Sequence, residues 1–376
     1  MKVMLEKDEV NHFLLAKGHL LPATRLESTG AVLKELIALD ANCLDDAYFS
    51  LYLRVRRFDV TAFEKGLYRG RSMARVRGLK NYMQIVPRDY LSAIYSASKA
   101  VREAAANSLL GTWGIDDEEY GEVSGRVLES LEGREKTMAQ LKRDLSAIAR
   151  VIRRRREKAE NISIVAQAMH ARWLILKGGI GRRPGESPGR LSLFRDRFSM
   201  ELEMDGEEAL SMLARRYVKA YGPVCAWDLA WWLGITLKEA SSLLEKMEGV
   251  ESVEIDGAGD AFFIDKRDLP LIKKLEGVPI IFLPKDDPYT KAYYNHARLV
   301  QGGRRHMTKF GESASAVLID GMVWGTWSLR KDAFSNACHI TLFKGYPEVR
   351  GESIEAAAME AGRFYTGGSV AVKVIR

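Results

Sequence analysis

Residues 222–235 read GPVCAWDLAWWLGI, and the rest of the chain can be organised around this stretch. Gly222-Pro223 interrupts the helix that precedes it, and residues 226–232 predict a short apolar helix. Gly234 then begins a turn into a further helix. This order predicts a helix-turn-helix.

The second helix of the pair is expected to begin at Thr236. The Thr236 hydroxyl and the Glu239 carboxylate stand three residues apart, which predicts a reciprocal capping box. Two apolar stretches follow, residues 250–255 and 261–264, and the glycine-containing turn between them predicts a two-stranded wing. We therefore interpret residues 207–268 as a winged helix.

The composition is that of an ordinary globular protein. The chain has 376 residues, of which 47% are hydrophobic and 28% charged, enough for about two to four domains. Its three cysteines, Cys43, Cys225 and Cys338, are too widely spaced to indicate a disulfide framework or a zinc knuckle. We expect a monomer of the cytoplasm, associated with the nucleoid, with no membrane segment, metal or cofactor.

Positive charge is concentrated in one part of the chain. The formal net charge is +7 and the pI about 9.1. Residues 150–197 hold 13 lysines and arginines against 4 aspartates and glutamates, a local net charge of +9. Such a block suits contacts with the phosphates of a nucleic acid, although a solvated helix face is the alternative interpretation.

A first module of the same type is predicted over residues 27–91. The chain breaks at residues 40–42 after an apolar helix, and Asp45 is placed to cap the helix that follows. Thr61 and Glu64 predict a second capping box, and a strand-like wing comes after that helix.

Another module lies between these two. Helices are expected at residues 119–131, 137–148 and 162–176, and a basic, glycine-containing loop at 178–190 leads to a strand at 191–200. The loop lacks the glycine spacing of nucleotide-binding loops, so we interpret it as the tip of a wing.

The texture of the sequence changes after residue 277. Five short strand-like runs and one helix, residues 353–365, predict a compact β-rich domain. We therefore predict an α+β protein with tandem winged-helix (helix-turn-helix) modules followed by a C-terminal β-rich, barrel-like domain. The expected domains are residues 1–105, 106–203, 204–275 and 276–376.

The modules differ in their suitability for DNA. The second helix of residues 207–268 carries more acidic than basic side chains (Lys238, Glu239, Glu245, Lys246 and Glu248), so we assign that module a scaffolding role. The first two modules are basic, and their predicted DNA-contacting residues are Arg54, Arg56, Arg75, Arg77, Lys80, Arg172, Lys177, Arg182, Arg183, Arg195 and Arg197. Basic contacts without an evident base-reading helix favour recognition of shape or of a lesion.

Four further stretches can be compared with a known family. They are LDAN at residues 39–42, RVRGLKNYMQIVP at 75–87, FLPKDDPY at 282–289 and SAVLIDGMVWGTW at 315–327. Together with residues 222–235, they resemble the AlkZ/YcaQ family of winged-helix DNA glycosylases over nearly the whole chain. The resemblance implies tandem winged helices, a β-barrel-like domain, and excision of alkylated or crosslinked purines from double-stranded DNA.

The resemblance also implies site residues. The family's catalytic motif is commonly Gln-x-Gln or Gln-x-Asp, and Asp40 and Asn42 occupy its two polar positions here. In the wing, Asn81 and Gln84 occupy the positions of the family's Gly and His, where contact with DNA is implied. All four residues depart from the family's usual ones.

Asp40 and Asn42 suit the chemistry that the family implies. A purine alkylated at N7 or N3 is cationic and leaves without a strong general acid, so one carboxylate can orient water and stabilise an oxocarbenium-like sugar. We expect Asp40 to take this role and Asn42 to hold the water or the deoxyribose. The alternative is that both residues only end one helix and begin the next, as Asp and Asn often do.

Two other functions stay open at this point. A non-enzymatic winged-helix DNA-binding or regulatory protein would have the same modules, and would bind one operator about 10³-fold more tightly than random duplex. A catalytically inactive relative that only binds lesions is the third possibility. The identity of the lesion and whether its base is flipped are not decided by the sequence.

Overall fold

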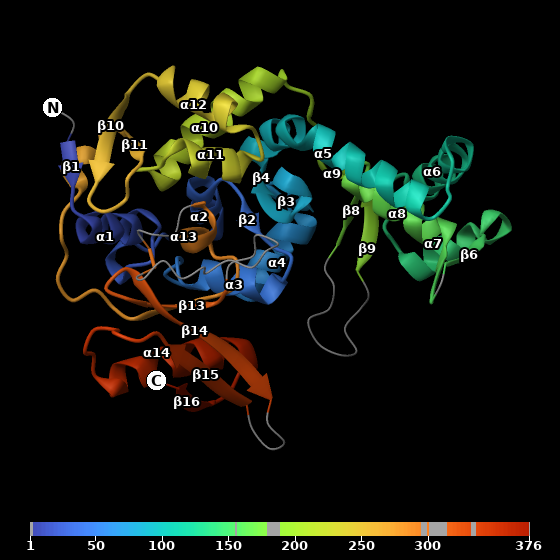
Figure 1. Cartoon of the computed structure of the whole chain (residues 1–376). Coiled ribbons are helices and arrows are strands. Elements are labelled where there is room, and N and C mark those ends of the chain that lie inside the picture. The colour runs from blue at the N-terminus through green and yellow to red at the C-terminus, as the bar shows by residue number, and fades with distance from the viewer. Residues whose placement is uncertain are drawn as a thin grey trace. The chain divides into compact units, whose positions relative to one another are not determined.

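The computed structural model describes residues 3–154, 156–178, 189–294, 299–300, 314–331 and 336–375. The chain forms two compact units (Figure 1). The first unit combines Met1–Phe58 with Ser211–Arg376, and the second is the continuous segment Asp59–Leu210. Among the described residues, no helix has the length and apolar character needed to span a bilayer.

The first unit contains eight α-helices among the described residues. They are α1 (Lys7–Lys17), α2 (Thr29–Leu36), α3 (Leu44–Tyr52), α10 (Gly206–Tyr221, which begins just before the unit boundary), α11 (Ala226–Leu233), α12 (Leu237–Glu245), α13 (Pro288–Lys291) and α14 (Gly351–Thr366). Its strands are β1 (Val3–Leu5), β2 (Leu39–Asp40), β10 (Val250–Ile255), β11 (Ala261–Asp265), β12 (Ile281–Leu283), β13 (Ala316–Ile319), β14 (Met322–Lys331), β15 (Asn336–Leu342) and β16 (Ala371–Ile375).

The two helices predicted around the Gly234 turn are present as α11 and α12. Gly234 ends α11 with a left-handed φ of 75°, a conformation that glycine adopts without strain. The predicted capping box opens α12: the Thr236 amide donates to the Glu239 carboxylate at 2.8 Å, and the Glu239 amide donates to the Thr236 hydroxyl at 3.3 Å. The two orphan amides are therefore satisfied as predicted.

The hairpin after α12 has one strand more than predicted. Strands β10 and β11 pair antiparallel, as the alternation of apolar residues indicates. In addition, β1 from the N-terminal region pairs parallel with β10, which gives a three-stranded sheet in the order β1-β10-β11. The short run Val3–Leu5 gave too little pattern for this strand to be recognised.

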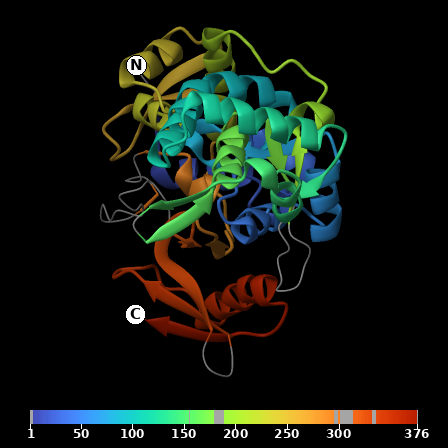
Figure 2. The same cartoon turned by 90° about the vertical axis from the view of Figure 1, so that its right-hand side faces the viewer.

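The C-terminal region forms an open five-stranded sheet in the order β12-β13-β14-β15-β16. Its strands and α14 lie within a few residues of the predicted positions. Figure 2 shows α14 along one face of this sheet, in contact with β12, β15 and β16. Helix α14 connects β15 to a parallel β16, and β12 and β16 form the two edges of the sheet. The described strands therefore do not close into the barrel-like arrangement that was expected.

An aromatic cluster joins α3 to this sheet and to α14. Phe49 of α3 packs against Trp327, Phe364 and Tyr365, with ring centroids between 5.0 and 6.2 Å apart. The Tyr365 hydroxyl also donates to the Asp46 carboxylate at 2.7 Å. Such aromatic pairs stabilise beyond the area they bury, so the cluster makes α3 and the C-terminal sheet parts of one core.

The second unit contains α4 (Val60–Arg69), α5 (Leu91–Thr112), α6 (Asp117–Leu131), α7 (Met138–Asp144), α8 (Asn161–Ala171) and α9 (Phe194–Arg197). Its strands are β3 (Met73–Arg77), β4 (Met83–Pro87), β5 (Lys136–Thr137), β6 (Val151–Arg154), β7 (Glu157–Glu160), β8 (Ile175–Lys177) and β9 (Arg190–Leu193). An apolar core between α5, α6, α7 and α8 holds it together. The strand predicted at 191–200 is shorter, because its second half forms α9.

Two predicted helix caps are wrong. Helix α4 is capped by Asp59, whose carboxylate accepts from the Ala62 amide at 3.0 Å, so Thr61 lies inside the first turn and the capping box with Glu64 does not form. Helix α3 begins after Cys43, so Asp45 lies in its first turn. An acidic side chain there still favours the helix through the dipole.

Candidate functional site

Asp40 lies at the end of the short strand β2, immediately after a tight backbone turn. Ile37 leaves α2 with a φ of 67°, a strained value for a β-branched residue, and the chain then extends through Asp40. The N-cap of α3 is Cys43, so Asp40 caps neither neighbouring helix. This position argues against the interpretation that Asp40 only ends one helix and begins the next.

The Asp40 carboxylate forms an ion pair with a lysine from a distant part of the chain. Lys291 Nζ lies 2.6 Å from Asp40 Oδ2 and 3.1 Å from Asp286 Oδ1. The side chains of the three residues are only 8–10% exposed. One ammonium group therefore lies between two carboxylates in a nearly dry environment, and we call these residues the Asp40–Lys291–Asp286 cluster.

The charge state of Lys291 follows from its neighbours. Burial lowers the pKa of the ammonium group, but Asp40 and Asp286 raise it more, so the pKa lies above its ordinary value. Lys291 is therefore a cation at neutral pH and cannot accept a proton. When both carboxylates are ionised the cluster has a net charge of −1, which suits a neighbouring group that becomes positive.

A second network fixes the helix that carries Lys291. Asp287 caps α13 by accepting from the Tyr289 amide at 2.9 Å. Its carboxylate also receives both terminal nitrogens of Arg54, at 2.7 and 2.8 Å, and the Ser50 hydroxyl at 2.6 Å. Asp287 therefore braces the start of α13.

Arg54 is removed from the DNA-contacting set by this network. Its side chain is 1% exposed, and a buried, bidentate pair with Asp287 leaves no part of the guanidinium for a phosphate. Asn42, in contrast, is exposed two residues beyond Asp40.

Three of the predicted DNA-contacting cations come together in the second unit. Arg75 and Arg77 lie on β3, Lys177 lies on the adjacent β8, and Trp173 Nε1 donates to the Arg77 carbonyl at 2.6 Å. Burial and then repulsion from Arg77 and Arg75 lower the pKa of Lys177. Like charges held this close indicate a site for an anion.

His170 lies beside these cations. It is 3% exposed, and burial followed by the positive charges of Lys177, Arg77 and Arg75 lowers its pKa well below the ordinary value. His170 is therefore a buried, neutral residue at physiological pH.

The remaining predicted DNA contacts have mixed environments. Arg56 and Arg195 are exposed, and each forms an ion pair on the surface, with Glu27 and Glu132 respectively. Arg172 is bound to Glu103, Arg197 donates to the Gly70 carbonyl, and Lys80 lies over the Tyr82 ring. Arg182 and Arg183 lie outside the described residues.

Of the two wing positions implied by the family, Asn81 lies in the turn between β3 and β4, and Gln84 lies on β4. Asn81 has a φ of 62° within that turn. Gln84 is 7% exposed, and its Oε1 accepts from the Leu79 amide at 3.0 Å. Gln84 therefore holds the hairpin turn, which is a structural role and corrects the expectation that it reaches DNA.

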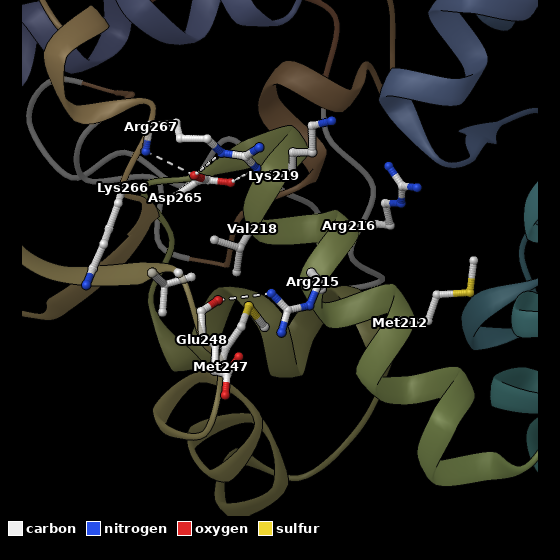
Figure 3. Close-up of a pocket in the computed structure, with 12 residues that line it drawn as sticks. Met212, Arg215, Arg216, Val218, Lys219, Met247, Glu248, Asp265, Lys266 and Arg267 are labelled. Carbon is white, nitrogen blue, oxygen red and sulfur yellow. Dashed lines mark hydrogen bonds and ion pairs between the residues drawn. The ribbon is translucent and has the colours of Figure 1, made fainter.

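A hollow of about 550 Å³ lies elsewhere in the first unit, between α10, the end of α12 and the end of β11 (Figure 3). Five cations line it: Arg215, Arg216, Lys219, Lys266 and Arg267. Two acidic residues, Asp265 and Glu248, also line it, and hydrogen bonds from Arg267 lower the pKa of Asp265 to about 2. None of these residues stands at a catalytic position implied by the resemblance, so this hollow is not the candidate active site.

The sequence of the chain matches a known protein family. The family described as "DNA glycosylase AlkZ-like" matches residues 33–364. The chain belongs to this family. It is therefore an AlkZ-like DNA glycosylase, and DNA is its partner. The match contains both Asp40 and Lys291.

A solved structure shows the same fold as this AlkZ-like chain. The Streptomyces sahachiroi DNA glycosylase AlkZ is similar with a TM-score of 0.75 and 16% sequence identity, over 100% of both chains. A search of the curated proteins finds no match.

Sequence reasoning missed Lys291 and Asp286 as members of the site. The only local signal was the pair of acidic residues in FLPKDDPY, followed by a lysine one helical turn later. Their meeting with Asp40 depends on tertiary structure, which an AlkZ-like motif alone does not reveal.

Proposed function

We propose that this AlkZ-like protein hydrolyses the N-glycosidic bond of alkylated purines in double-stranded DNA, including N7 or N3 adducts and crosslinked bases. The observation that carries the proposal is the Asp40–Lys291–Asp286 cluster at the position of the family's catalytic motif. The lesion, the role of Asp40 and the monofunctional chemistry are all parts of this proposal.

Asp40 has the chemistry that the reaction needs. An alkylated purine is already cationic, so bond breaking leaves positive charge on the sugar, and the cluster's net negative charge stabilises that charge as it develops. The neighbouring ammonium group of Lys291, 2.6 Å from Asp40 Oδ2, fixes the orientation of the Asp40 side chain. A carboxylate held in this way can orient the attacking water while Asn42 holds the water or the deoxyribose.

The charge state of Lys291 favours hydrolysis by water, the monofunctional route, over attack on the sugar by a lysine amine. A lysine that attacked the sugar would have to lose its proton, and the raised pKa of Lys291 opposes that loss. We therefore assign Lys291 to positioning Asp40.

Phosphate contacts are proposed for the cations of the second unit. Arg75, Arg77 and Lys177 form the main site, because they lie on adjacent strands and repel one another in the absence of an anion. Lys80, Arg172 and Arg195 of the same unit, and Arg56 of the first unit, are proposed as peripheral contacts.

The test is release of free base from duplex DNA that carries N7-methylguanine, with Asp40→Asn as the matched variant. We expect the wild type to release the base and the variant to be slower by about 10²- to 10⁴-fold, with an affinity for DNA that changes little. Retained melting temperature would show that the variant is folded. Unchanged release by the variant would refute the role of Asp40, and no release from methyl or bulky adducts by the wild type would favour a non-enzymatic DNA-binding protein.

A further inference from the structure

Two large aromatic side chains of the first unit are stacked on each other and half exposed. Trp227 on α11 is 47% exposed, and Tyr294, three residues after α13, is 53% exposed. Their ring centroids are 5.6 Å apart and their planes differ by 22°. Side chains of this size usually bury most of their surface, so an exposed stack indicates a surface that binds something.

The stack is rigid because its backbone is held by hydrogen bonds. The Tyr294 amide donates to Asp228 Oδ1 at 2.8 Å, and the other Asp228 oxygen accepts from the Cys225 amide at 3.1 Å. Asp228 itself is 1% exposed. The two rings are thus positioned in advance, and a ligand that stacks on them loses little entropy in ordering them.

The stack is also linked to the candidate active site through a third aromatic residue. Trp231 lies one helical turn after Trp227, and its ring centroid is 6.2 Å from that of Tyr294. Its Nε1 donates to the Lys291 carbonyl at 3.1 Å. Lys291 therefore contacts the aromatic surface with its backbone and Asp40 with its ammonium group.

We propose that Trp227 and Tyr294 form a stacking platform for the cationic ring of the alkylated purine. This inference rests on the proposed function and names how the lesion is selected. The faces of tryptophan and tyrosine carry negative charge density, so they bind a positively charged ring more strongly than a neutral one. Alkylation at N7 or N3 makes the purine cationic, and this charge distinguishes it from every undamaged base.

The proposal can be tested by binding alone, without catalysis. The probe is a duplex with one 2′-fluoro-arabino N7-methylguanosine, since the fluorine disfavours the oxocarbenium-like state and preserves the cationic base. The reference is the same duplex with 2′-fluoro-arabino guanosine. We expect Trp227→Ala to weaken binding to the cationic duplex by about 5- to 150-fold and to leave the reference unchanged.

Two control variants make the result specific. Trp227→Phe retains a ring and should recover part of the preference for the cationic duplex. Leu271→Ala removes another exposed apolar side chain of the same unit, 58% exposed, and should not change the preference.

The outcomes separate this proposal from the proposed function. An equal loss on both duplexes, or no loss on either, would overturn the platform. Absence of base release in the activity assay would contradict the glycosylase proposal and leave the binding comparison interpretable, because the binding experiment requires no bond breaking.

Discussion

Replacing Lys291 with methionine should destabilise the first unit strongly. The substitution keeps a side chain of similar length and removes the positive charge that lies 2.6 Å from Asp40 and 3.1 Å from Asp286. At an effective dielectric constant of about 20, unit charges at these distances attract by about 6 and about 5 kcal/mol. Burial of the three charges offsets much of this attraction, because each buried ion costs several kcal/mol.

The net effect can be estimated from what is left behind in the variant. Two carboxylates would remain about 90% buried with no cation between them, and removal of one partner from a buried ion pair costs about 3–5 kcal/mol. A typical domain is stable by about 5–15 kcal/mol, so Lys291→Met should lower the free energy of unfolding by a large fraction. Excision should fall as well, since Asp40 loses the group that orients it.

The assay is urea unfolding of the full chain, followed by fluorescence, with Lys274→Met as the control. Lys274 also pairs with an aspartate, Asp8, at 2.5 Å, but its side chain is 64% exposed, so its removal should change the midpoint little. Equal midpoints for wild type, Lys291→Met and Lys274→Met would refute the electrostatic argument.

The pH dependence gives a second check on Lys291. Its folded pKa is raised, so its stabilising contribution is complete below the unfolded value of about 10.4 and is lost as the pH rises through the folded value. The difference in stability between wild type and Lys291→Met should therefore persist from neutral pH to about pH 10 and shrink above it. A difference that shrinks between pH 7 and 9 would contradict the assignment.

Three further predictions follow from other parts of the structure. Arg77→Ala or Lys177→Ala should reduce the slope of log K against log salt for undamaged duplex by about 1, measured by fluorescence anisotropy, and an unchanged slope would exclude a phosphate contact. His170 takes up a proton below about pH 6.5 in the unfolded state but not in the folded state, so the free energy of unfolding should decrease as the pH falls, by up to about 1.4 kcal/mol per pH unit. His170→Phe should flatten this dependence in denaturation series at pH 5–7, and an equal slope in the variant would contradict the reasoning. Gly325→Ala should lower the melting temperature, because a Cβ there would lie 2.6 Å from the Thr341 carbonyl oxygen. An unchanged melting temperature would show that β14 and β15 can move apart to accept the methyl group without loss of stability.

Features with local causes could be predicted from the sequence. The Thr236–Glu239 capping box needs only four residues, and it forms as expected. The alternating strands and the single helix of the C-terminal region were placed within a few residues for the same reason. Thr61 and Glu64 have the same spacing, yet Asp59 caps that helix, because the backbone is already extended at Asp59 and turns helical at the next residue.

The site could be predicted only in part. The motif position of Asp40 is readable from the chain, but its partners Lys291 and Asp286 are brought to it by tertiary structure. The prediction for Arg54 failed for the same reason. Its positive charge suggested a surface contact with DNA, but Asp287, 233 residues later in the chain, pairs with the guanidinium and allows it to be buried.

The discontinuity of the first unit has a consequence for protein synthesis. Its early part, Met1–Phe58, is synthesised before the whole inserted unit, Asp59–Leu210. The partner of Arg54, Asp287, is synthesised 233 residues after it. At about 5–20 residues per second, a ribosome needs roughly 10–50 seconds to supply that partner. The inserted unit has its own apolar core and can fold during this interval. The carboxylate of Asp40 therefore emerges early but meets Lys291 late, so the candidate active site is among the last parts of the chain to assemble.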